Sequence, residues 1–300
     1  MLALLSFIIW AQQMAVAQPM NGGAPVAYQQ EIETWRAQRL ARLKADGGWL
    51  TLAGLFWLKP GRNGFGADPS NEIVLPGHGA PPRAGVFRLD AGRVTVEVLA
   101  GVPVTVAGKP ITRATLHSDA AGEPDVLRLG PLSLQIIARG DRLGVRVKDL
   151  QSPTRQQFKA PAWYPVRPAY RVSARFVAHA AATTITVPSV IGIAEPMVSP
   201  GSALFELGGR ELRLDPVLEP GETQLFFIFR DATSGRGSYG GGRFLYADPP
   251  KDGRIVLDFN KAYSPPCAFT PYATCPLPPA QNRLAVAIEA GEMSGSGETR

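Results

Sequence analysis

The sequence is poor in the residues that carry most nucleophilic, acid–base and metal chemistry: it has three histidines and two cysteines among 300 residues. A zinc site needs about four ligands at short characteristic spacings. His78, His117 and His179 do not lie at such spacings from the cysteines, so we expect no metal and no cofactor. The chain also lacks G-x-S-x-G, S-x-x-K, H-E-x-x-H and P-loop motifs. Their absence argues against the common serine hydrolases, zinc proteases and nucleotide hydrolases.

Runs of basic residues are missing as well. The formal net charge is +6, but the lysines and arginines are scattered along the chain, so we expect no nucleic-acid partner. A mildly basic surface instead favours a small anionic molecule as the partner. The oligomeric state is left open.

Long apolar runs are absent beyond the N-terminus, so no transmembrane segment is expected once that part is removed. There, LALLSFIIWA precedes an Ala15-Val16-Ala17 cleavage pattern. These features predict a signal peptide over residues 1–17, cleavage near Ala17, and a periplasmic or secreted protein. No Lys or Arg precedes Arg36, which is atypical of a signal, and an uncleaved anchor helix is the alternative.

Turn-forming residues are abundant, with 32 glycines and 28 prolines. Short alternating segments such as RVTVEVLA and RLGVRVKD lie between them, a pattern typical of antiparallel strands. Ile32, Trp35, Leu40 and Leu43 recur near helical spacing and predict a helix over Glu31–Lys44. We therefore predict a mainly β protein: a single antiparallel β-sandwich or barrel-like domain with an N-terminal helix and a proline-rich C-terminal loop. Residues 18–29 are interpreted as a linker, 30–293 as the domain and 294–300 as a flexible tail, with a split near Ala160–Pro168 as the alternative.

Gly235 to Gly240 match G-x-G-x-x-G. A dinucleotide site needs a helix after this motif, whereas GGRFLYADPP predicts a strand and a turn. The segment is interpreted as a glycine-rich hairpin loop, or as a nest of N–H groups that holds an anion with Arg236 or Arg243.

The proline-rich segment SPPCAFTPYATCPLPP contains both cysteines, Cys267 and Cys275. Their spacing and the predicted export favour a loop-closing disulfide. Two buried free thiols, or a reactive thiol, are the alternatives.

Polar residues gather just before this loop. If Asp258–Tyr263 is a strand, Asp258 and Asn260 share one face, and Lys261 and Tyr263 the other. They either tether the loop, together with Asn282 and Arg283, or face a ligand. Earlier in the chain, alternation in RGDRLGVRVKD places Arg146 and Lys148 on one face after a turn at Gly140-Asp141. The candidate ligand-binding residues are Asp231, Tyr239, Arg243, Asp258, Asn260, Lys261, Tyr263 and Arg283.

Four segments carry a family resemblance: GWLTLAGLFWLKPGRNGFG, RGDRLGVRVKD, FRDATSGRGSYGGGRFLYAD, and LDFNKAYSPPCAFTPYATCPLPPAQNRLAVAIEAGE. From about Trp35 to Glu292 the chain resembles the family known as domain of unknown function 1684. For this family we expect Asn-Pro-Pro-Cys at the start of the proline-rich loop, and here Ser264 stands in place of the asparagine. The resemblance implies a shared C-terminal block but assigns no activity. Some relatives lack an export signal, so the resemblance does not require a disulfide.

Three functions stay open, and whether the protein is an enzyme is undecided. The first is a small-molecule or anion-binding pocket in the C-terminal block, where Arg243, Lys261 and Arg283 neutralise an acidic ligand. The second is a hydrolase of unfamiliar type, with Asp231 or Asp258 as general base and Lys261 or Tyr263 as acid. The third is a structural or interaction module of the cell envelope.

Overall fold

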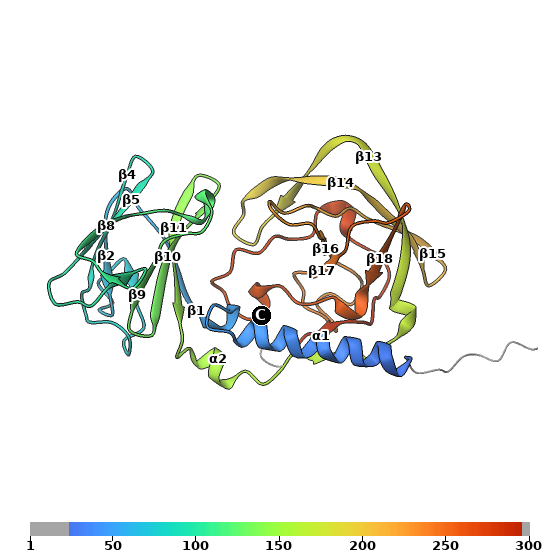
Figure 1. The fold of residues 1–300 in the computed structure, drawn as a ribbon, viewed down its shortest axis with the longest axis horizontal. Coiled ribbons are helices and arrows are strands. Elements are labelled where there is room, and N and C mark those ends of the chain that lie inside the picture. The colour runs from blue at the N-terminus through green and yellow to red at the C-terminus, as the bar shows by residue number, and fades with distance from the viewer. Residues whose placement is uncertain (1–23, 296–300) are drawn as a thin grey trace, which may run out of the picture.

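The structure is a computed structural model that describes residues 24–295. The predicted signal peptide and residues 296–300 of the predicted tail lie outside this range. Within it, no helix combines the length and apolar character needed to span a membrane. The described chain folds into two lobes, with the longest helix lying along one of them (Figure 1).

The N-terminal helix is longer than predicted. Helix α1 spans Val26–Lys44 and starts directly after Pro25, so it includes residues that the sequence analysis assigned to a linker. Its first turns are stabilised by tertiary contacts, because Tyr28 and Ile32 are buried against the C-terminal lobe. Helix α2 is short, Pro153–Gln157. Six 3₁₀ turns complete the helical elements of residues 24–295: Trp49–Thr51, Asp119–Ala121, Pro168–Tyr170, Phe259–Lys261, Pro266–Ala268 and Ala280–Asn282.

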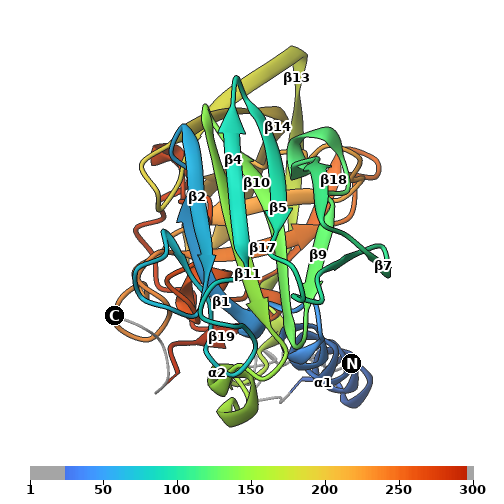
Figure 2. The same ribbon diagram turned by 90° about the vertical axis from the view of Figure 1, so that its left-hand side faces the viewer.

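The N-terminal lobe consists of two stacked sheets, seen face on in Figure 2. The first has the strand order β1 (Leu52–Trp57), β11 (Arg142–Asp149), β10 (Leu132–Arg139), β9 (Val126–Leu129), β6 (Thr105–Val106) and β7 (Lys109–Pro110). The second has the order β3 (Ile73–Val74), β2 (Gly61–Gly66), β4 (Gly85–Asp90), β5 (Arg93–Val98) and β8 (Arg113–Leu116). Alternate residues such as Phe87, Val96 and Leu134 point between the sheets and form one hydrophobic core.

The C-terminal lobe is built around a four-stranded sheet. Its strand order is β15 (Arg210–Leu214), β14 (Ala194–Leu207), β13 (Arg171–Pro188) and β18 (Arg254–Asp258). Two smaller pairs accompany it: β16 (Leu225–Phe229) with β17 (Arg243–Ala247), and β12 (Ala162–Trp163) with β19 (Glu292–Met293). Strand β16 is LFFIF and is buried along its whole length, since both of its faces contribute to hydrophobic clusters.

The predicted fold class is confirmed: the protein is mainly β, with several antiparallel sheets and an N-terminal helix. No sheet of the described residues closes into a barrel. The proline-rich loop after β18 forms only short 3₁₀ turns, because proline lacks the N–H donor that a strand or helix needs.

Candidate functional site

Asp231 and Arg243 form a buried ion pair. The Arg243 Nη2 atom lies 2.6 Å from Asp231 Oδ2, and neither side chain is exposed. Arg243 also donates to the carbonyl oxygens of Ile288 and Ala290, while Asp231 accepts from Thr233 and Ile288. The expectation that Arg243 neutralises a ligand is therefore wrong for this structure: its charge is compensated by Asp231 inside the lobe.

Part of the glycine-rich loop uses its N–H groups within the loop itself. The backbone N–H groups of Arg236, Gly237 and Ser238 all donate to the carbonyl oxygen of Thr233. Tyr239, from the same segment, reaches the proline-rich loop and donates from its hydroxyl to the Cys267 carbonyl oxygen at 3.2 Å. The hairpin-loop interpretation fits this geometry, because these three N–H groups are used inside the loop.

Asp258 and Asn260 meet beneath helix α1. The Tyr28 hydroxyl donates to Asp258 Oδ1 at 2.7 Å and accepts from Asn260 Nδ2 at 3.0 Å. The Asn260 amide also bonds both backbone groups of Arg167. The predicted strand through Tyr263 is wrong, since β18 ends at Asp258 and a 3₁₀ turn follows. The turn places both side chains inward, where they tether the turn to the helix.

Lys261 and Arg283 are not placed together at a site where they could neutralise a ligand. The Lys261 Nζ atom lies 2.6 Å from Glu31 Oε1 on α1, so its charge is already paired. Arg283 is exposed and lines neither of the two cavities described below. The expected cluster of ligand-neutralising cations in the C-terminal block does not form.

Cys267 and Cys275 lie side by side as free thiols. The backbone N–H of Cys267 donates to Cys275 Sγ at 3.1 Å. The hydrogen bond from Cys275 lowers the pKa of the Cys267 thiol, and that same contact together with burial raises the pKa of Cys275. The disulfide stays a prediction.

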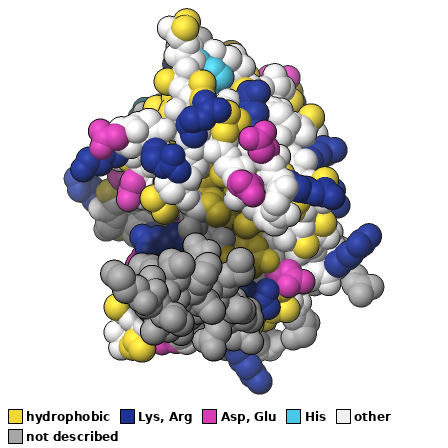
Figure 3. All heavy atoms as spheres, turned by 90° about the vertical axis from the view of Figure 1, so that its right-hand side faces the viewer, with side chains coloured by type: hydrophobic (Ala, Val, Ile, Leu, Met, Phe, Trp, Pro, Cys, Tyr) yellow, Lys and Arg dark blue, Asp and Glu magenta, His cyan; other side chains and the backbone are white. Residues whose placement is uncertain are grey.

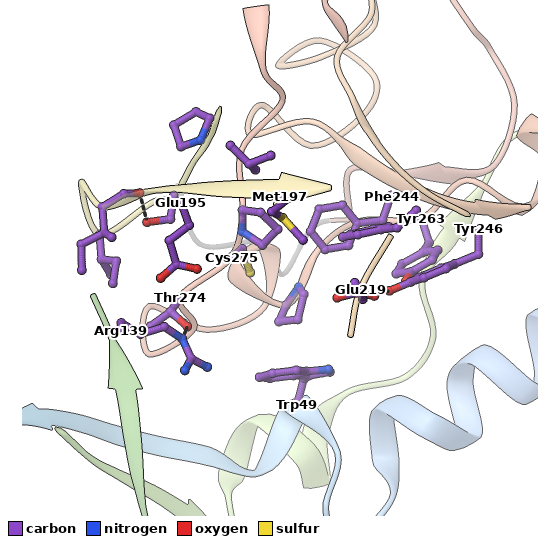
Figure 4. A pocket seen from close by; sticks show the side chains of 18 of the residues that line it. Trp49, Arg139, Glu195, Met197, Glu219, Phe244, Tyr246, Tyr263, Thr274 and Cys275 are labelled. Carbon is purple, nitrogen blue, oxygen red and sulfur yellow. Dashed lines mark hydrogen bonds between the residues drawn. The ribbon is translucent and has the colours of Figure 1, made fainter. Parts of the chain in front are cut away.

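The main cavity has a volume of about 660 Å³ and lies between the two lobes. Trp49 forms one wall, and Phe244, Tyr246 and Tyr263 lie at the far end, as Figure 4 shows. Phe226 of β16 also lines the cavity. Of the eight candidate ligand-binding residues, only Tyr263 lines this cavity, together with Cys275 of the predicted disulfide. Its main side chains are those of Arg39, Arg42, Trp49, Arg139, Val187, Glu195, Met197, Glu219, Phe226, Phe244, Tyr246, Tyr263, Thr274 and Cys275.

Helix α1 supplies the charge next to Tyr263. The Arg39 guanidinium lies 4.3 Å from the centre of the Tyr263 ring, donates to the Ser264 carbonyl at 2.8 Å and lies 3.5 Å from Glu292 Oε2. Burial raises the pKa of Tyr263 to about 12. Burial also raises the pKa of Glu292 to about 7, and the positive charge of Arg39 opposes this shift without cancelling it.

A second cavity, of about 520 Å³, adjoins the first. The two share Arg39, Arg42, Tyr246 and Tyr263. Asp258 and Lys261 line the second cavity, but both are engaged with α1. On the face to the right of Figure 1, shown in Figure 3, acidic and basic side chains are interspersed around a hollow with apolar side chains at its base.

The residues that line the main cavity come from six separate parts of the chain, which explains why motif analysis missed most of them. Arg139 lies at the end of β10, Glu195 and Met197 on β14, and Tyr246 on β17. Alternation along RGDRLGVRVKD places Arg146 and Lys148 on one face of a strand, but nothing in the sequence places Arg146 beside Thr274. Among residues 24–295, no cluster of three or more His, Cys, Asp or Glu side chains is arranged to hold a metal.

Comparisons with known proteins identify relatives but no activity. The chain is similar to an uncharacterised protein of Haloarcula marismortui whose structure was solved by NMR. The two sequences are 33% identical, and the alignment covers 46% of this chain and 78% of that chain with a TM-score of 0.40. A phosphothreonine-dependent FHA domain shares 21% identity over 31% of this chain and 92% of that chain, with a TM-score of 0.23. Mycobacterium tuberculosis EmbR in complex with a low-affinity phosphopeptide shares 15% identity over 41% of this chain and 31% of that chain, with a TM-score of 0.22. The likeness to the FHA proteins is too weak to carry an argument, and no curated protein matches.

A family model described as "Protein of unknown function (DUF1684)" matches residues 156–293. The match covers the C-terminal lobe, whereas the resemblance in the sequence begins much earlier, near Trp35. Over these residues the chain resembles the DUF1684 family.

Proposed function

We propose that the protein binds a small molecule with an apolar body in the main cavity. Ligand sites in proteins are mostly concave and apolar, with volumes of roughly 300–1,000 Å³ and a few placed polar groups. The cavity of about 660 Å³ fits this description in size and in its walls. The walls are predominantly aromatic and aliphatic, and they include a few charged groups such as Glu219, which accepts a hydrogen bond from Tyr246.

The observation that carries the proposal is the pair of facing aromatic walls. Trp49 comes from the turn after α1, and Phe226, Phe244 and Tyr246 come from the β16–β17 pair. A tryptophan that is 37% exposed and faces other aromatic side chains offers contact area to an apolar ligand from both sides.

The test uses the fluorescent probe 1-anilinonaphthalene-8-sulfonate, which binds apolar sites. We expect saturable binding to the native protein, with energy transfer from tryptophan to the bound probe. Trp49→Phe should reduce this transfer strongly. Trp57→Phe is the matched control, because Trp57 lies outside the cavity under the Arg142 guanidinium. Equal transfer in both variants, or no saturable binding, would contradict the proposal.

The hydrolase alternative loses one of its two candidate bases, since Asp231 is buried in an ion pair with Arg243. The envelope-module alternative has no observation in its favour beyond the chain's composition.

We further propose that the protein acts in the periplasm or outside the cell. N-terminal sequencing of the exported chain tests this proposal, and we expect the mature chain to start near Gln18.

A further inference from the structure

Two arginines converge on one hydroxyl at the Trp49 end of the main cavity. The Thr274 Oγ1 atom, in the proline-rich loop, accepts from Arg139 Nε at 3.1 Å and from Arg146 Nη2 at 3.2 Å. A hydroxyl has two acceptor lone pairs and one donor hydrogen. Both lone pairs are used by guanidinium groups, so the hydrogen is left to be donated. Arg139 and Thr274 lie together on the cavity wall in Figure 4.

Arg146 is the unusual member of this group. It lies on β11, behind Thr274, and is 5% exposed. No carboxylate of the described residues pairs with it, and its Nε atom has no hydrogen-bond partner there. Its guanidinium lies 5.6 Å from the centre of the Trp49 ring. Burial, and then the charge of Arg139, lowers the pKa of Arg146 to about 10. A buried cation of this kind favours an anion nearby.

Arg139 has donors that remain available. Its Nη1 atom is paired with Asp119 at 2.8 Å, whereas Nη2 makes no hydrogen bond to residues 24–295. Among the ion pairs of the described residues, Asp119 pairs with Arg139, and no carboxylate pairs with Arg146. Glu195 lines the cavity but is exposed and forms no ion pair with either arginine in the described chain.

We propose that this end of the cavity, defined by Arg139, Arg146 and Thr274, is a carboxylate-binding subsite. The Nη2 group of Arg139 and the Thr274 hydroxyl donate to the two carboxylate oxygens, and the Arg146 charge acts from behind Thr274. Two donor groups side by side match the two oxygens of a carboxylate. The ligand class is therefore an apolar molecule that ends in a carboxylate. This inference rests on the proposed function, because the apolar body occupies the rest of the cavity.

The experiment compares decanoate with decanol, which has the same chain and no charge, by calorimetric titration of the purified protein at pH 8. We expect decanoate to bind at least about tenfold more tightly, the size expected for hydrogen bonds to a charged group. Thr274→Val and Arg139→Gln should each remove most of this preference and leave decanol binding unchanged. Arg142→Gln is the matched control, since Arg142 lies over Trp57 outside the cavity, and it should keep the full preference.

Each result separates the two proposals. Equal binding of decanoate and decanol to the unmodified protein overturns the carboxylate subsite and leaves the apolar cavity standing. A preference for decanoate that survives both Thr274→Val and Arg139→Gln places the anion elsewhere and also overturns the subsite. Binding of neither compound overturns the proposed function together with this inference. If Arg139→Gln fails to fold, Thr274→Val decides, because it removes only a hydroxyl.

Discussion

The buried pair of Asp231 and Arg243 joins β17 to the C-terminal segment of the chain. Breaking a buried ion pair by removing one partner costs about 3–5 kcal/mol, because the other charge is left unpaired. We expect Arg243→Met to lower the free energy of unfolding by this amount in urea denaturation. The double variant Asp231→Leu/Arg243→Met should recover most of the loss, since it leaves no lone charge.

Arg230→Met is the control for this prediction, because Arg230 is exposed on the neighbouring strand end. Its free energy of unfolding should change by less than about 0.5 kcal/mol. A loss of the same size in Arg230→Met and Arg243→Met would contradict the role assigned to the pair.

The raised pKa of Glu292 makes the free energy of unfolding depend on pH. Its pKa is raised from 4.5 to about 7, so between these values the folded protein holds a proton that the unfolded chain has released. The free energy of unfolding therefore falls as pH rises through this window. We expect wild type to lose about 3 kcal/mol relative to Glu292→Gln between pH 4.5 and 7, measured by urea denaturation at several pH values.

Glu289→Gln serves as the comparison for Glu292→Gln, since the Glu289 side chain is 53% exposed and pairs with Arg167 at the surface. Its stability relative to wild type should be nearly flat over the same pH range. A flat difference for Glu292→Gln would show that Glu292 is ionised in the folded protein throughout.

At the scale of elements, helix α1 is held to the C-terminal lobe through its polar side chains. Tyr28 bonds Asp258 and Asn260, and Arg39 bonds the carbonyl oxygen of Ser264. Tyr28→Phe removes one hydroxyl and leaves buried polar groups without their partner, which costs about 1–3 kcal/mol. We expect that loss in the free energy of unfolding, together with faster hydrogen exchange in Val26–Lys44.

Tyr170→Phe is the matched change, because Tyr170 packs against the hydrophobic core of the same lobe, and none of the bonds just named between α1 and that lobe uses its hydroxyl. It should leave exchange in α1 unchanged. If Tyr28→Phe also leaves it unchanged, the hydroxyl does not fasten the helix.

The proline-rich loop carries the disulfide prediction. A bond between Cys267 and Cys275 closes a small loop and stabilises by roughly 2.5 kcal/mol in the chain-entropy model. The lowered pKa of Cys267 favours its oxidation, because the thiolate is the reactive form. We expect no free thiol in an Ellman assay of denatured, unreduced protein from an oxidising compartment, and two free thiols would contradict the bond.

Some elements could be predicted from the sequence, and others could not. RVTVEVLA and LFFIFRD correspond to β5 and β16, because alternation and β-branched or aromatic content act within a few residues. The start of α1 was placed too late, since its first turns depend on the contact of Tyr28 with Asp258, 230 residues away. The alternation of side chains predicts a strand through Tyr263 and does not predict the turn at Phe259–Lys261. The strand ends at Asp258 because the Asp258 carboxylate accepts a hydrogen bond from the Asn260 N–H.

At the scale of the whole molecule, the two lobes are joined near the end of α1. Arg155 donates to the Lys44 carbonyl at 2.8 Å and pairs with Asp46 at 2.6 Å, and Lys148 donates to the Gly47 carbonyl at 2.8 Å. We expect residues 30–293 to unfold in one transition, with equal calorimetric and van't Hoff enthalpies. Arg155→Gln should shift that transition as a unit; two resolved transitions in wild type would contradict the single-domain prediction.

The sequence by itself determined the mainly β class and the buried character of strands such as β16, because hydrophobic periodicity and turn chemistry are local properties. It also located the C-terminal block, which lies within the residues that the family model matches. Only the tertiary structure decided which polar residues face a cavity. Arg243 and Asp231, twelve residues apart, neutralise each other, whereas Arg139 and Arg146 meet Thr274 across more than one hundred residues. Such convergence depends on how the lobes pack, and no spacing along the chain encodes it.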